Sequence, residues 1–418
     1  MTANDKRIVL VILSLCLTSA ALGGNVPTIR WGHQLLTDTD GVPRAAVVGS
    51  EGGIYFTVKQ KPNDTSGPAS EGLFLLKYSQ EGDQLWSKRL DPKVEDTDGL
   101  TADDQGNIYV FGHVSSTPER ETKGGYDAFI AKYDQAGSQQ WVLQPGTTKH
   151  DVCTGLDFDT DGNLFISGYT YGNFAKPNKG GCDMFIAAYN KHRNLLWRDQ
   201  IGTAADDRAV DIRVGDNNDV YICGNTSGNL ARENNGQGDF VVARYDRTGK
   251  RLWLHQYGTN AYESIMCMEI GELGHLYLGC RSNGSFGYRR PRRVDLDSCL
   301  VSITKTGKML WVRQFGTGAW DGTWDMARFM DGSGDILIAG CQIPVKNKCQ
   351  AYCRRYSSEG ELIWTKEFRK NSPRGGTCGR VAAIDSSNNV YHAGWTRGDL
   401  FGVNNGTGNM FIVRFDSK

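Results

Sequence analysis

The spacing of the cysteines helps to distinguish disulfide chemistry from metal binding. Ten of them follow residue 150, where no two are spaced as Cys-x-x-Cys and no histidine lies at zinc-finger distance. Disulfides are therefore favoured over zinc, and we predict no metal and no cofactor. The expected pairs are Cys280 with Cys299, and Cys341 with Cys349 or Cys353.

Acidic residues recur along the chain, but their pattern favours a structural role. Asp157, Asp159 and Asp161 resemble the start of a calcium loop, yet its twelfth position is Gly168, where a bidentate Glu is needed. A second set opens successive strands, at Asp127, Asp183, Asp239 and Asn409. Such residues typically cap backbone N–H groups. The seven histidines follow no catalytic pattern. We predict no catalytic residue and no enzymatic activity.

Aromatic and basic residues outside the regular pattern are the candidates for binding. Two sets stand out: Trp320, Trp324 and Trp395 with Asp321 and Asp325, and the cluster Arg289, Arg290, Arg292 and Arg293. Trp320 and Trp324 are expected in one loop, and Trp395 at the start of another. Aromatic rings beside polar groups suit sugar stacking or a protein contact, with loop packing as the alternative. The arginines suit a sulfated or phosphorylated polymer, a furin-type processing site or a solvated loop.

The N-terminus has the pattern of a secretory signal peptide. Lys6 and Arg7 precede an apolar run at residues 8–17, and small residues follow at 20–23. We predict removal of residues 1–23, secretion, and no membrane span in the mature chain. The N-glycosylation candidates are Asn63, Asn225, Asn283 and Asn405.

Composition bounds the class of protein. The 418 residues are 39% hydrophobic, which is enough for a packed core, and 52 glycines imply many tight turns. Lys and Arg number 47, as do Asp and Glu, so the formal net charge is zero. No global field would hold a nucleic acid or an anionic membrane.

One repeat of about 55 residues runs through the chain. Seven tryptophans mark it at intervals of 55, 55, 56, 56, 58 and 53 residues: Trp31, Trp86, Trp141, Trp197, Trp253, Trp311 and Trp364. Each copy contains four short runs of alternating or apolar residues between turn signals, for example at 154–159, 163–169, 183–189 and 195–200. Four strands in this length make one blade of a β-propeller.

The two ends of the chain predict how the ring closes. The chain starts with a tryptophan strand at residues 29–36 and stops after a strand that ends at Asp416, so the last copy lacks its fourth strand. We predict an all-β, seven-bladed propeller of four-stranded blades, formed by residues 24–418. Its last blade is closed by the N-terminal strand, which leaves no open edge.

The repeat resembles a known family. The segments from Asp127 to Trp141, Asp183 to Thr203 and Asp239 to Thr259, with runs of the type Gly-Asn-x-Tyr-x-x-Gly, are similar to the SBBP-type β-propeller repeat. The resemblance extends over about residues 29–418, with degenerate first, sixth and seventh copies. It implies the propeller fold and says little about function, because a propeller is a scaffold for many different sites.

Three functions are consistent with these features. We favour a secreted, monomeric, non-enzymatic scaffold of the extracellular matrix that binds a protein or glycan, with no nucleic acid as partner. The alternative is a lectin-like module that binds glycans on its tryptophan-rich loops. The least favoured is a quinoprotein-like enzyme, which the Tyr-Asp-x-x-Gly-x-x-x-Trp segments resemble. Such enzymes have eight blades and often adjacent cysteines, whereas this chain predicts seven blades and has no adjacent cysteines.

Overall fold

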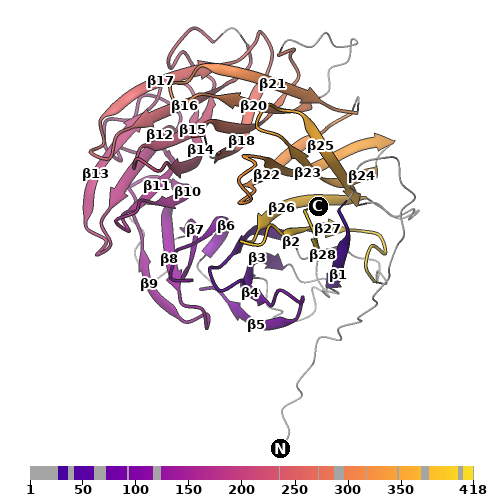
Figure 1. Ribbon diagram of the computed structural model, residues 1–418. Coiled ribbons are helices and arrows are strands. Elements are labelled where there is room, and N and C mark those ends of the chain that lie inside the picture. Colours follow the sequence, from indigo (N-terminus) through magenta and orange to yellow (C-terminus); the bar gives the residue numbers. More distant parts are fainter. Residues whose placement is uncertain are drawn as a thin grey trace, which may run out of the picture.

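The computed structural model describes residues 27–35, 42–60, 72–91, 94–115, 124–234, 236–271, 273–286, 296–317, 319–345, 348–368, 376–402 and 408–417. These residues form seven antiparallel sheets of four strands, arranged as blades around a central channel (Figure 1). The predicted seven-bladed all-β propeller is confirmed, and the elements of the described part are all strands. That part contains no helix long and apolar enough to cross a membrane.

Each blade runs from an inner strand at the channel to an outer strand at the rim. Blade one is β2 (Val42–Val48), β3 (Ile54–Gln60), β4 (Gly72–Tyr78) and β5 (Gln84–Arg89). Blade two is β6 (Val94–Ala102), β7 (Ile108–Ser115), β8 (Tyr126–Tyr133) and β9 (Gln139–Leu143). Blade three is β10 (Asp151–Phe158), β11 (Leu164–Thr170), β12 (Asp183–Tyr189) and β13 (Leu195–Ile201). Blade four is β14 (Asp207–Val214), β15 (Val220–Thr226), β16 (Asp239–Tyr245) and β17 (Arg251–Tyr257).

The remaining blades complete the ring. Blade five is β18 (Glu263–Ile270), β19 (Leu276–Ser282), β20 (Asp297–Ile303) and β21 (Met309–Phe315). Blade six is β22 (Gly322–Arg328), β23 (Ile336–Val345), β24 (Lys348–Tyr356) and β25 (Leu362–Phe368). Blade seven is β26 (Thr377–Ile384), β27 (Val390–Thr396), β28 (Asn409–Phe415) and β1 (Ile29–Leu35).

The seventh blade joins the two ends of the chain. β1 runs antiparallel to β28, with Gly32 opposite Val413 and Gln34 opposite Phe411. Figure 1 shows the indigo β1 beside β28 in this blade. This sheet agrees with the predicted closure by the N-terminal strand, so backbone hydrogen bonds link the first strand to the last.

The periodic tryptophans connect adjacent blades. Each lies on an outer strand, and six of them donate an indole N–H to a backbone carbonyl of the next blade. Trp197, for example, donates to the carbonyl of Arg247 at 3.0 Å. Gly249 has φ of +86°, and a Cβ there would lie 2.5 Å from the Trp197 ring. The tryptophan spacing equals the blade length because each copy repeats this contact.

Outer-strand glutamines hold the long loops between the second and third strands. The Gln200 amide donates to Asp183 at 2.8 Å and to the carbonyl of Gly172 at 3.1 Å. Its oxygen accepts from the N–H groups of Ala175 and Lys176. Gln256 repeats these contacts in blade four. The aspartates that open the third strands therefore have the structural role that the sequence favoured.

The hydrophobic core is divided among the interfaces between blades. Between blades four and five, Tyr221 and Phe240 are buried in one cluster with Ile265 and Leu276. Similar buried clusters join other neighbouring blades. Alternating strands explain this division, because each sheet buries both faces between its two neighbours.

Candidate binding site at the channel mouth

Every inner strand carries an extra residue near its start, where the register with the second strand shifts, and β6 carries a second one, Glu95, before it. Such a bulge kinks the strand and re-aims the inserted side chain. The inserted residues line the central channel at the end that receives the connections between blades. In blade order they are Arg44, Asp98, Thr154, Val210, Met266, Trp324 and Arg380.

Two of the three predicted binding tryptophans lie together at this end. Trp324 is the inserted residue of β22, and Trp320 precedes that strand, with ring centroids 5.6 Å apart. Both rings are half-buried. Trp395 lies within β27, so its predicted place at the start of a loop is wrong. Its backbone is paired with Cys378, and its ring contacts Arg397 at 5.6 Å.

Two arginines lie over the Trp324 ring. The guanidinium of Arg380, from blade seven, is 4.2 Å from the ring centroid, and that of Arg281, from blade five, is 5.4 Å away. Arg281 also lies 5.7 Å from the Trp320 ring. The Nε atoms of both arginines are buried and have no hydrogen-bond partner among the described residues. Burial lowers the pKa of Arg281, and the positive charge of Arg380 adds to this effect.

Neither arginine forms an ion pair with a carboxylate in the described part of the chain. Both guanidinium groups are half-buried, and the anionic group that interacts with them among the described residues is the Cys341 sulfur, so an acidic group of a ligand placed between them would be stabilised further. Each guanidinium makes a cation–π contact: Arg281 with the rings of Trp320 and Trp324, and Arg380 with that of Trp324. The site can therefore hold an acidic group of a ligand against an aromatic wall.

Three free thiols lie behind Trp324. They belong to Cys341 in β23, Cys349 in β24 and Cys378 in β26, and their sulfur atoms lie within 4.8 Å of one another. The sulfurs of Cys341 and Cys378 are 2.8 Å apart, and the Trp324 indole N–H donates to Cys341 at 3.1 Å. Hydrogen bonds from Cys349 and Cys378, with smaller effects of Trp324 and the charge of Arg380, hold the pKa of Cys341 well below its usual range.

The two carboxylates predicted to join the tryptophans make backbone contacts instead. Asp321 is 1% exposed, and its carboxylate accepts from the N–H of Thr317 at 2.7 Å. Asp151, Asp207 and Glu263 make the same contact at the start of other blades, so Asp321 belongs to the repeat. Asp325 lines the channel and accepts from the N–H of Ala382 in the next blade at 2.9 Å. Both contacts are structural.

The channel encloses roughly 500 Å³ and is lined by charged residues. The sequence analysis did not predict that these residues lie close together. Arg213 forms ion pairs with Asp211 and Glu269, and its charge also interacts with those of Asp157 and Asp325. Burial raises the pKa of Asp157 to about 6 and that of Asp325 to about 7. Asp325 is therefore partly protonated at neutral pH, which reduces repulsion among the carboxylates.

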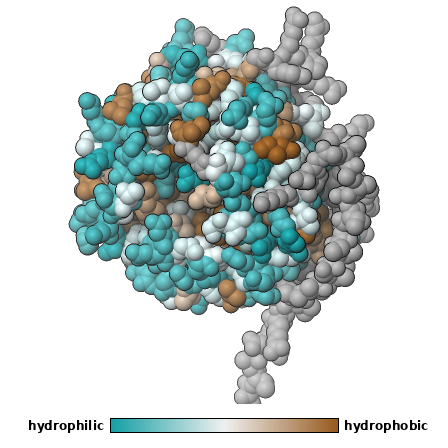
Figure 2. All heavy atoms as spheres, in the orientation of Figure 1, coloured by the Kyte–Doolittle hydropathy of each residue, from teal (hydrophilic) through white to brown (hydrophobic). Residues whose placement is uncertain are grey.

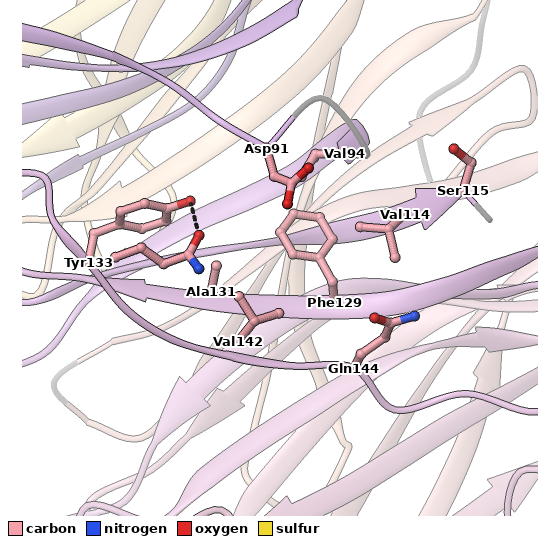
Figure 3. A pocket seen from close by; sticks show the side chains of 10 residues that line it. Asp91, Val94, Val114, Ser115, Phe129, Ala131, Tyr133, Val142 and Gln144 are labelled. Atoms are coloured by element: carbon pink, nitrogen blue, oxygen red, sulfur yellow. Dashed lines mark hydrogen bonds between the residues drawn. The ribbon is translucent and has the colours of Figure 1, made fainter. Parts of the chain in front are cut away.

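A second, small cavity lies in blade two (Figure 3). Phe129, Val114 and Val142 provide its apolar wall, and Asp91 and Gln144 lie at its edge. Its volume of about 20 Å³ has room for about one water molecule. It is too small for a ligand.

The other predicted site residues have mixed outcomes. Arg289, Arg290, Arg292 and Arg293 and the sequons at Asn63 and Asn405 lie outside the described residues, as does the predicted signal peptide. Asn283 follows β19, and its side-chain oxygen accepts from Tyr262 N–H. Asn225 lies within β15, and its amide is hydrogen-bonded to the backbone of Ile265, which opposes attachment of a glycan.

The predicted cysteine pairs are only partly recovered as neighbours. Cys280 lies directly opposite Cys299 in β19 and β20, and a disulfide between them stays a prediction. Cys341 lies beside Cys349, as one predicted pair requires. Cys353 is buried in the apolar cluster between blades six and seven.

The functional residues that the sequence did not predict are Arg281, Arg380 and Cys378. Arg281 is the last residue but one of the second strand of its blade. Alignment of the repeats places Tyr169, Asn225 and Trp395 at the same position in other blades. A tryptophan at that position is conspicuous in the sequence, whereas an arginine is not. The bulge that inserts Arg380 has no clear signal in the sequence.

Comparison with known proteins supports the repeat assignment. The family model SBBP, described as a beta-propeller repeat, matches residues 140–175. These residues carry an SBBP-type repeat. The predicted resemblance is thereby confirmed in blades two and three, and the four-stranded blades agree with it elsewhere in the ring.

One curated relative and two solved structures illustrate what this chain is similar to. Regulatory protein FlaEY of Caulobacter vibrioides is 27% identical over 278 residues, which are 59% of this chain and 28% of that protein. BBS1N, solved in complex with ARL6DN, matches with a TM-score of 0.54 at 9% identity, over 93% of this chain and 97% of that one. The Pan2 WD40 domain of Neurospora crassa has a TM-score of 0.52 at 9% identity, over 90% of each chain. At these identities the structures show the propeller fold alone.

Proposed function

We infer that this chain is a secreted, non-enzymatic propeller that binds an acidic group of an extracellular partner at its channel mouth. The observation that carries this inference is the pair of arginines over Trp324, Arg281 at 5.4 Å and Arg380 at 4.2 Å. Secretion rests on the N-terminal pattern of Lys6, Arg7 and the apolar run at residues 8–17.

Charge supports an acidic ligand. The formal net charge is zero, so attraction of an anion has to come from a local group of cations rather than from the whole surface. Arg281 and Arg380 provide such a group, whereas Arg44, the inserted residue of the blade that follows Arg380, is paired with Asp96 at 3.0 Å. The coloured residues of the face in Figure 2 are mostly hydrophilic, and the apolar ones form small separate groups rather than one broad patch.

The arrangement also favours an anion over a neutral sugar. A sugar that stacks on Trp324 would have to displace guanidinium groups that already lie over that ring. A carboxylate, sulfate or phosphate would instead bind these groups through charge-assisted hydrogen bonds. The lectin-like alternative is therefore the less favoured proposal, and neutral oligosaccharides test it.

The test uses the full chain and fluorescence anisotropy of three labelled probes: a poly-glutamate peptide, a heparin-derived oligosaccharide and a neutral oligosaccharide. We expect at least one anionic probe to bind, with an affinity that falls as salt concentration rises. Arg281→Gln and Arg380→Gln should each weaken binding by about 1.5–3 kcal/mol, since each removes a partly buried charged hydrogen bond. The anionic probe that binds identifies the source of the acidic group.

Arg247→Gln is the matched control, because Arg247 is exposed in a turn of blade four, away from this site. It should leave binding unchanged. The proposal is wrong if the three arginine variants weaken binding equally, or if neither anionic probe binds. Preference for the neutral probe, lost in Trp320→Ala, would favour the lectin-like alternative.

A further inference from the structure

Three thiols from three strands converge between blades six and seven. Cys341 and Cys349 belong to neighbouring strands of blade six, and Cys378 belongs to the inner strand of blade seven. Their three sulfur atoms lie within 4.8 Å of one another. In a tetrahedral zinc site with Zn–S bonds of about 2.3 Å, the sulfurs are about 3.8 Å apart. Small side-chain rotations would bring all three to that spacing.

The backbone is built so that these strands can approach. Gly376 precedes β26, and a Cβ on this residue would lie 2.5 Å from the backbone nitrogen of Cys349. Any other residue would push the start of β26 away from β24 and separate Cys349 from Cys378. A glycine at this position is therefore required by the contact that completes the group of sulfurs.

The surroundings suit a site with net negative charge. Three thiolates and one divalent cation carry a charge of −1. Arg380 and Arg281 both interact electrostatically with Cys341, and neither has a carboxylate partner among the described residues. The Trp324 N–H, 3.1 Å from the Cys341 sulfur, is a typical outer hydrogen bond to a metal-bound thiolate. With the two guanidinium groups, a zinc site of this kind would carry a net charge of +1, so the arginines would stabilise the thiolates and still attract an acidic ligand.

We propose that Cys341, Cys349 and Cys378 bind one zinc ion, which links blade six to blade seven. Three thiols lose their protons to the solvent as the three zinc–sulfur bonds form, and a water molecule fills the fourth position. No oxidant is needed. A disulfide would use two of the sulfurs and leave the third without a role, whereas zinc uses all three. The proposal shares Arg281, Arg380 and Trp324 with the proposed function, but it requires no partner of the propeller, so zinc content and anion binding are measured separately.

The test measures zinc on the full chain purified under reducing conditions. We expect about one zinc per chain by elemental analysis, and cobalt(II) in its place should give the intense visible bands of a tetrahedral thiolate site. Cys341→Ala, Cys349→Ala and Cys378→Ala should each weaken zinc binding by roughly 100-fold or more. Cys223→Ala in blade four is the matched control, since it also removes a buried thiol, and it should keep the zinc.

Thermal unfolding supplies a second measurement that does not depend on elemental analysis. Added chelator should lower the midpoint of the wild-type chain and leave that of the Cys378→Ala chain unchanged. The proposal is overturned if the reduced wild-type chain binds no stoichiometric zinc or cobalt. It is also overturned if the control loses zinc as the ligand variants do, or if a disulfide between Cys341 and Cys378 is found in the folded chain.

Discussion

Replacement of Gln200 by Met tests whether outer-strand glutamines hold the long loops of the binding face. Gln200 is 4% exposed, so water cannot take over its hydrogen bonds when the amide is removed. Methionine has nearly the same length and volume, which limits the change to the removal of polar groups. The substitution abolishes the four side-chain hydrogen bonds of Gln200, which join it to Asp183, Gly172, Ala175 and Lys176.

The expected cost follows from these four hydrogen bonds. Each contributes about 1 kcal/mol net, and the one to the Asp183 carboxylate somewhat more, so Gln200→Met should lower the free energy of unfolding by about 3–5 kcal/mol. Gln256→Met in blade four is the matched comparison. There Arg232 remains 3.0 Å from Asp239 as a charged partner, whereas Asp183 keeps the N–H of Lys179 at 3.2 Å, so the decrease should be smaller by about 1 kcal/mol.

Urea unfolding of the two variants and the wild type measures these costs, and limited proteolysis reports on the loop between β11 and β12. We expect Gln200→Met to unfold at lower urea than Gln256→Met and to be cut within residues 171–182. The explanation is refuted if Gln200→Met unfolds within about 1 kcal/mol of the wild type, or if Gln256→Met is the less stable variant.

Three further predictions concern the ring. Gly249→Ala should destabilise the chain by about 2–4 kcal/mol in urea unfolding, because φ is +86° and the new Cβ would clash with Trp197. Gly162→Ala is the control: φ is +75° but the Cβ would have open space, so it should destabilise the chain by only about 1 kcal/mol. The pKa of Asp325 is raised to about 7, so the native state binds a proton that the unfolded state releases at lower pH. The free energy of unfolding should therefore fall between pH 5 and 8 by about 1–3 kcal/mol, and less so in Asp325→Asn; an equal fall in both would contradict this assignment. Deletion of β1 (Ile29–Leu35) should expose β28 as an open edge, which lowers the unfolding midpoint and promotes self-association in light scattering; an unchanged chain would rule out closure by this strand.

The architecture was predictable because its signals are local. A tryptophan recurs once per copy since each blade needs the same indole contact to the next, as Trp197 makes to Arg247. Gly249 follows from the same contact. Strand alternation, turn residues and this recurring pair lie within one repeat or between neighbouring repeats, so the sequence displays them at a constant spacing. The missing fourth strand of the last copy also predicted the pairing of β1 with β28.

The binding tryptophans were found in part for the same reason. Trp320 and Trp324 depart from the repeat, and that departure is visible without a structure. Asp321 and Asp325 were predicted to join these tryptophans in a binding site. Instead, Asp321 accepts a hydrogen bond from the N–H of Thr317, and Asp325 accepts one from the N–H of Ala382 in the next blade. Trp324 is the extra residue of β22, and the bulge turns its side chain toward the channel. Simple alternation of side chains along a strand does not predict this orientation.

The number of blades, their four strands and the closure of the ring can be predicted from the sequence, because these depend on periodic, local patterns. Which side chains meet at the channel mouth depends on the folded ring. Arg281 and Arg380 are 99 residues apart and come from blades five and seven, yet both lie over Trp324. Cys378 reaches Cys341 across a blade interface in the same way. Contacts between blades depend on the curvature of the closed ring and on the bulges, and neither leaves a regular spacing in the chain.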